Sequence, residues 1–129
     1  MDSSERLVHR IVEAARRVHR ELGPGFIESI YGCALVKELK NSGLHFEREK
    51  QITIWYGSSV VGKHRLDLVV EQAVVVELKA NRGLIGVHLA QMNSYLHATN
   101  YPVGVILNFG MPELGVEIVP SAKANDSRA

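Results

Sequence analysis

The segment from Ala73 to Phe109 constrains the fold of this chain most strongly, because its apolar period changes twice. Residues 73–79 form a run of branched apolar side chains typical of a strand, 84–98 an amphipathic helix, and 103–109 a further strand. A strand, a helix and a strand in this order predict a right-handed crossover and a parallel strand pair. The segment therefore predicts an α/β sheet.

The remaining segments add two helices before this unit and three further strands. The helices are expected at Ser4 to Leu22 and Phe26 to Asn41, and the strands at His45 to Tyr56, Val60 to Val70 and Val116 to Val119. The order α-α-β-β-β-α-β-β predicts one mixed sheet flanked by helices. We expect a single domain over residues 1–120 and a flexible tail over 121–129.

Apolar positions predict which helix faces are buried. Ser3 or Ser4 is the expected cap of the first helix, which Gly23-Pro24-Gly25 ends. The expected buried positions of the second helix are Ile27, Ile30, Tyr31, Ala34, Leu35 and Leu39, and those of the third are Ile85, Leu89, Met92 and Leu96. The single cysteine, Cys33, lies among apolar neighbours, which predicts a core residue.

Composition excludes several classes of protein. The chain of 129 residues is 46% apolar and 22% charged, has no apolar run of membrane-spanning length and begins without the layout of a signal peptide. We expect a cytoplasmic protein with no membrane partner. One cysteine excludes an internal disulfide and a thiolate zinc cluster. A net charge of +1 means that a polyanion would be bound through local patches or metal ions.

Three charged residues, Asp67, Glu77 and Lys79, interrupt the apolar strands. An edge hairpin whose charged side chains face water would explain them. Glu77 and Lys79, however, leave the same face of a strand at the carboxyl end of the expected parallel pair, where sites of such sheets gather. A carboxylate there suits magnesium, and the neighbouring amine suits a water molecule or a phosphate anion.

The length of the turn after Val70 decides whether Asp67 joins this site. A two-residue turn pairs Val70 with Ala73 and points Asp67 away from Glu77. A three-residue turn pairs Val70 with Val74 and brings Asp67 opposite Glu77, where two like charges are unfavourable without a cation between them. The site hypothesis requires the longer turn or a bulge.

Asp67, followed after nine residues by Glu77-Leu78-Lys79, resembles the D…ExK signature of the PD-(D/E)xK nuclease superfamily. Gly25-Phe26-Ile27-Glu28-Ser29-Ile30-Tyr31 fits GxxExxY, the pattern that names one family within it. Val18 to Gly25 and Gln91 to Tyr95 also resemble that family, so the likeness covers nearly the whole chain. It implies a restriction-endonuclease-like mixed sheet flanked by helices.

The resemblance implies a site for Mg²⁺, with Mn²⁺ as a substitute, held by Asp67, Glu77, Glu28 and the main-chain carbonyl of Leu78. RecB-like modules also carry a histidine that can bind the metal on the preceding helix, which points to His19. The helix dipole alone would also account for two of these residues. Glu28 suits the first turn of a helix and His19 suits the last, because acids are favoured at the positive end of the dipole and cations at the negative end.

Further residues have expected roles around Lys79. Gln91 and Tyr95 match the QxxxY element of RecB-like nucleases, which helps position the lysine and the substrate phosphate. A solvated shoulder of the helix is the alternative, and we retain it for His88. Trp55 and Tyr56 suit stacking on an unpaired base, although packing in the core or at the sheet rim is favoured.

The leading functional hypothesis is a Mg²⁺- or Mn²⁺-dependent deoxyribonuclease, an exonuclease that acts on single-stranded DNA. The alternative is a non-catalytic nucleic-acid- or protein-binding module on the same fold, and the intact acid–acid–lysine set favours the enzyme. A hydrolase of a small phosphorylated substrate would lack a phosphate-binding glycine loop. A homo-oligomer is compatible with the sequence.

Overall fold

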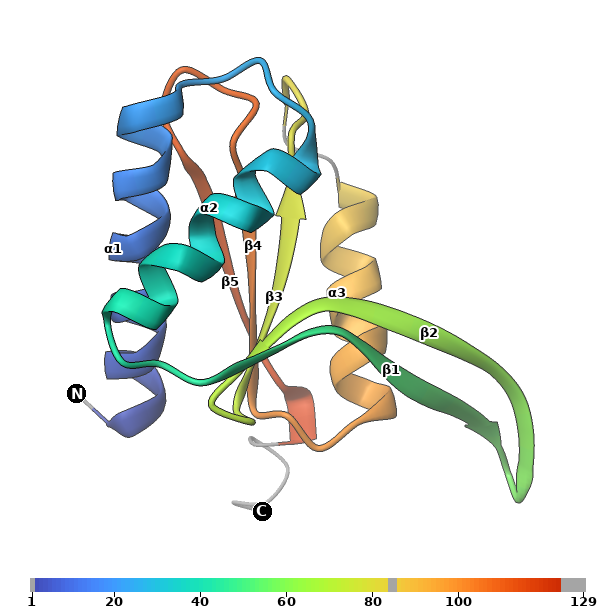
Figure 1. Ribbon diagram of the computed structural model, residues 1–129. Helices are drawn as coiled ribbons and strands as arrows, with labels where there is room; N and C mark the ends of the chain where they lie inside the picture. Colours follow the sequence, from blue (N-terminus) through green and yellow to red (C-terminus); the bar gives the residue numbers. More distant parts are fainter. Residues whose placement is uncertain (1, 84–85, 124–129) are drawn as a thin grey trace.

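A five-stranded sheet carries two helices on one face and a third on the other (Figure 1). This computed structural model describes residues 2–83 and 86–123. The elements are α1 (Ser3–Leu22), α2 (Glu28–Asn41), β1 (Phe46–Tyr56), β2 (Ser59–Val70), β3 (Val74–Lys79), α3 (Gly86–Ala98), β4 (Val103–Asn108) and β5 (Gly115–Pro120). No helix among the described residues is long and apolar enough to cross a membrane.

The strands lie in the sheet in their order along the chain, from β1 at one edge to β5 at the other. β3 and β4 are parallel, with Val74 beside Val103 and Lys79 beside Asn108, and all other neighbours are antiparallel. The predicted α/β class, mixed sheet and parallel pair are therefore confirmed. β2 and β3 are inner strands, so the edge-hairpin interpretation of the charged residues is wrong.

Apolar side chains pack against both faces of the sheet. Because successive residues of a strand point to opposite faces, Val74 and Val76 pack with α1 and α2, whereas Val75 packs with α3. Burial on both faces explains why β3 reads as a nearly continuous apolar run. Glu77 is the one charged residue within that buried run.

The start of α1 differs from the prediction. Asp2 is the cap, because its Oδ1 accepts a hydrogen bond of 2.8 Å from Glu5 N. Ser3, the first helical residue, and Ser4 therefore do not cap the helix. The carboxylate of Asp2 also complements the positive end of the helix dipole.

The first turn of α2 is more exposed than predicted. The helix begins at Glu28, and Ile27 and Ile30 are 68% and 41% exposed, because the helix packs through Tyr31 and later residues. Cys33 is exposed as well, so its assignment to the core was wrong. It lies two residues after Tyr31, about 200° around the helix, and therefore points away from the core.

Parts of two other expectations lie outside the described residues. Leu84 and Ile85, predicted to begin the third helix and its buried face, are among them, as are residues 124–129 of the expected tail. Ser121, at the start of that tail, is buried.

Tyr31 joins the loop between α1 and α2 to the core. Its hydroxyl donates to Gly23 O and accepts a hydrogen bond of 3.1 Å from Phe26 N, and its ring stacks on Phe109 with centroids 4.5 Å apart. Gly25, at φ 119°, has a backbone conformation that side chains rarely allow. The glycine and tyrosine of GxxExxY therefore shape the loop that precedes Glu28, and the tyrosine hydroxyl bonds to backbone rather than to Glu28.

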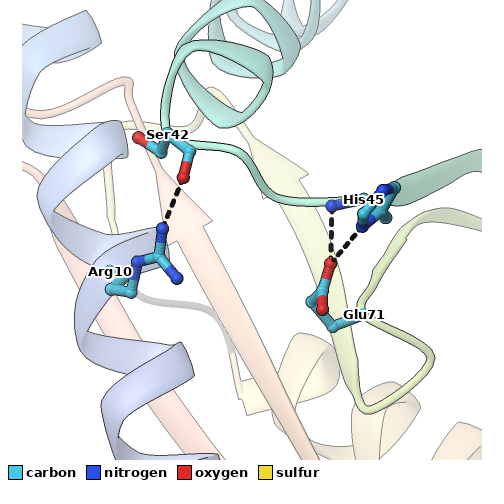
Figure 2. A network of polar contacts seen from close by, with 4 residues as sticks. All are labelled: Arg10, Ser42, His45 and Glu71. Atoms are coloured by element: carbon cyan, nitrogen blue, oxygen red, sulfur yellow. Dashed lines mark hydrogen bonds and ion pairs between the residues drawn. The ribbon is translucent and has the colours of Figure 1, made fainter.

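A polar network fixes the turn between β2 and β3 (Figure 2). Oε2 of Glu71 accepts hydrogen bonds from His45 N at 2.6 Å and from His45 Nδ1 at 3.1 Å, which lower the pKa of Glu71. Arg10 donates to Ser42 O at the end of α2, so α1 is held to the same region. The turn spans three residues and pairs Val70 with Val74, as the site hypothesis requires.

We expect Tyr31→Phe to lower the free energy of unfolding by about 1–3 kcal/mol, because the Gly23 carbonyl and the Phe26 amide lose a shared partner. The ring and its stacking on Phe109 remain. Urea denaturation would measure the change, with Tyr56→Phe as the control, since Tyr56 is 80% exposed. Equal stabilities for Tyr31→Phe and the parent would contradict this role for the hydroxyl.

Candidate functional site

β2 and β3 separate beyond the pair Leu68–Val76, and two acidic side chains bridge the gap. Oε2 of Glu77 accepts a hydrogen bond of 2.8 Å from Asp67 N, and Oδ2 of Asp67 accepts one of 2.8 Å from Leu78 N. Each carboxylate satisfies a backbone N–H of the opposite strand. We call this place, defined by Asp67 and Glu77, the fork.

Glu77 is 6% exposed, a costly position for a carboxylate. Its burial, and then the negative charge of Asp67, raise the pKa of Glu77 to about 7. The hydrogen bond from Asp67 N and the charge of Lys79 act in the opposite direction. Near neutral pH Glu77 therefore exists in both protonation states, and a bound cation would favour the charged one.

Lys79 leaves β3 on the same face as Glu77, at the carboxyl end of the parallel pair. It is half-buried and lines a small cavity with His88 and Asn108. Burial, and then the charge of Lys79, lower the pKa of His88. Among the described residues Lys79 forms no ion pair, so its amine remains available to a ligand.

Glu28 approaches the fork from the α2 side. It is exposed in the first turn of α2 and lines a cleft of about 330 Å³ with Asp67 and Leu78. Its negative charge contributes to the raised pKa of Glu77. Even so, across residues 2–83 and 86–123 no three Asp, Glu, His or Cys side chains are grouped closely enough to hold a metal ion.

His19 lies in a different environment. It is 8% exposed, its Nε2 donates to Met111 O at 2.8 Å, and its ring lies beside Phe109. The loop after β4 covers the end of α1, so His19 is buried and not a surface residue. Its role as a metal ligand is a prediction that these contacts leave open.

Gln91 and Tyr95 lie one turn apart on α3, but only Tyr95 is buried. Its ring stacks on His64 of β2, with centroids 4.6 Å apart. Burial, and then the charges of Glu77 and Asp67, raise the pKa of Tyr95. Gln91 is exposed.

The chemistry of the fork fits a hard divalent cation. Two acids face each other, and the crossed hydrogen bonds use one oxygen of each, Oδ2 of Asp67 and Oε2 of Glu77. The remaining oxygens suit magnesium or manganese, and a cation would relieve the repulsion that raises the pKa of Glu77. Two carboxylates are fewer ligands than such an ion takes, so the Leu78 carbonyl, Glu28 or water would complete the set.

A model of the PD-(D/E)XK nuclease superfamily matches residues 5–119. The chain belongs to this superfamily. Its members are typically nucleases and generally use divalent metal ions. Asp67, Glu77 and Lys79 all lie within the matched residues.

A solved structure shares the fold of this chain. The protein described as "Crystal structure of SSO0001" superposes with a TM-score of 0.58 at 22% sequence identity, over 78% of this chain and 54% of that one. This chain therefore spans about half the length of that relative. No curated protein matches the chain significantly.

Sequence reasoning missed several residues around the superfamily signature. His88 is half-buried beside Lys79, although we expected a solvated position. Arg48 and Glu49 line the cleft with Asp67, and Glu49 has a left-handed backbone at φ 51° that strands seldom contain. The spacing of His88, three residues before Gln91, was a usable signal, whereas nothing in the sequence indicates the conformation of Glu49.

We expect the stability of the metal-free protein to fall as pH rises from about 4.5 to about 7. Over this range the folded protein binds more protons at Glu77 than the unfolded chain, in which the pKa of Glu77 is near 4.5. Raising the pH therefore shifts the folding equilibrium towards the unfolded chain. The loss is about 3 kcal/mol. Glu77→Gln should remove this loss.

Urea denaturation in EDTA at pH 5 and pH 8 would measure the difference between the parent and Glu77→Gln. Glu113→Gln is the matched control, because Glu113 is exposed. Identical pH profiles for the parent and Glu77→Gln would show that Glu77 is not held in a costly charged state.

Proposed function

We propose that this protein is a Mg²⁺- or Mn²⁺-dependent nuclease that hydrolyses phosphodiester bonds of DNA. The observation that carries the proposal is the half-buried Lys79, whose amine has no ion pair among the described residues, beside the opposed acids of the fork. An ordinary stabilising lysine would lie in water or pair with an acid. An amine beside a cation site suits a substrate that carries negative charge.

The residues in and around the fork would have different roles in hydrolysis. Asp67 and Glu77, with Glu28 and the Leu78 carbonyl, would hold the metal. Lys79 would donate a hydrogen bond to the attacking water or to the phosphate oxygens, where negative charge grows in the transition state. When bound, the ion would lower the pKa of water and offset the charge of the phosphate.

Residues of α3 would position Lys79 and the phosphate. Tyr95 is buried on α3, and Gln91 lies one turn earlier on the same helix. The QxxxY spacing and the GxxExxY loop support a RecB-like member of the GxxExxY family. We therefore propose exonuclease action on single-stranded DNA, in the cytoplasm.

A non-catalytic binding module is the second candidate, and one observation favours it. The acids of the fork bond to Asp67 N and Leu78 N, so they close a gap between strands that would otherwise leave these amides unpaired. A protein without catalytic activity thus has a structural reason to retain both acids. The function of Lys79 separates the two candidates, because no such structural bond involves its amine among the described residues.

We expect Lys79→Ala to reduce DNA cleavage by at least a hundredfold, with little change in melting temperature or DNA affinity, because the amine acts mainly on the transition state. Cleavage of end-labelled single- and double-stranded DNA, with Mg²⁺ and with EDTA, would measure this. Lys37→Ala is the control, since Lys37 is exposed on α2. Undiminished cleavage by Lys79→Ala, or cleavage in EDTA, would favour the binding module.

A further inference from the structure

The hairpin of β1 and β2 extends well beyond the rest of the sheet (Figure 1). β2 pairs with β3 only from Leu68 to Val70, whereas its pairing with β1 continues to Ser59 and Tyr56. A two-stranded ribbon is only marginally stable by itself. The stacking of His64 on Tyr95 connects this hairpin to α3.

A groove of about 900 Å³ lies between the hairpin and α3. Its described lining includes four rings and one lysine: Trp55, His64, Tyr95, His97 and Lys123. Trp55 is 60% exposed, so the expectation that it packs in the core or at the sheet rim is wrong. Exposure of a large aromatic ring in a groove is the arrangement by which proteins stack unpaired bases.

Tyr95 links the groove to the strands that carry the fork, because it packs in one buried cluster with Leu66 of β2 and Val75 of β3. The tyrosine side chain stands in the groove lining, and its pKa is raised by the charges of Glu77 and Asp67 in addition to its burial. The groove therefore adjoins the two strands whose acids form the fork. Lys79 lines a cavity with His88 and Leu89 of α3, so it lies on the α3 side of the sheet, as the groove does.

Charge also favours a polyanion over a second protein chain. None of the described residues that line the groove is acidic, although Asp and Glu make up 14 of the 129 residues. A groove lined by rings, a lysine and no acid among the described residues matches a single strand, whose phosphates and bases both need partners.

We propose that this groove is the path along which single-stranded DNA reaches the fork, with Trp55 and the His64–Tyr95 pair as stacking platforms for successive bases. The proposal rests on the function proposed above, because it takes the fork as the place of cleavage. Bases of a duplex are already paired and stacked, so the groove would discriminate against double strands. The hairpin would then serve as the outer wall of the substrate site.

The only tryptophan of the chain makes the proposal directly measurable. Titration of Lys79→Ala, which should not cleave, with oligothymidylate in Mg²⁺ should quench the fluorescence of Trp55. A duplex of the same length should quench it at least tenfold less effectively, and raising the salt concentration should weaken binding. An RNA oligomer as a further arm would show whether the sugar matters.

Substitutions then test the groove separately from the chemistry. Trp55→Ala should weaken oligothymidylate binding roughly tenfold, the loss of one stacked base, and raise KM for cleavage by a similar factor. Tyr56→Ala is the matched control, because Tyr56 is its neighbour on the hairpin, is 80% exposed and does not line the groove. Tyr56→Ala should bind and cleave like the parent.

The outcomes distinguish the two proposals. If Trp55→Ala binds and cleaves like the parent while Lys79→Ala does not cleave, the nuclease assignment stands and the groove assignment is wrong. If oligothymidylate quenches Trp55 but the parent cleaves no nucleic acid, the groove binds single-stranded DNA and the protein is a binding module. Equal losses for Trp55→Ala and Tyr56→Ala, or quenching by a second copy of the chain alone, would overturn the groove assignment.

Discussion

The register between β2 and β3 is the constraint on which the candidate site depends. A turn of three residues, with Glu71 and Gln72 both in the left-handed backbone region, pairs Val70 with Val74. The hydrogen bonds between Glu71 and His45 hold this turn against the start of β1. A turn shorter by one residue would direct Asp67 to the face opposite Glu77 and separate the two acids.

The same register determines the shape of the molecule around the site. Where the acids replace sheet pairing, β2 leaves β3 and continues with β1 as the projecting hairpin (Figure 1). Its departure opens a cleft on the α2 side, lined by Glu28 and Asp67, and the groove on the α3 side, lined by Tyr95. The two carboxylates that repel each other thus lie next to openings that would accommodate a cation and a phosphate.

The sequence predicted the fold and the pairing of the acids because these depend on local periodicity and on turn length. Apolar period and chain order were enough for the mixed sheet, and counting residues from Val70 was enough to restrict the register. Exposure was harder to predict. Cys33 and Ile30 are apolar and were expected in the core, but both are exposed, because the packing of Tyr31 decides which side of α2 is buried. The groove was beyond prediction, since it depends on how far the hairpin extends and on a contact between His64 and Tyr95.

The central claim is that Asp67 and Glu77 together bind a divalent cation. Anomalous diffraction from crystals soaked in Mn²⁺ at pH 8 tests it most directly, because manganese scatters anomalously and takes oxygen ligands as magnesium does. Our account predicts a peak between the two carboxylates, and no peak there in Glu77→Gln crystals. Parent crystals without a peak at saturating Mn²⁺, with both carboxylates still bonded to the Asp67 and Leu78 amides, would contradict it.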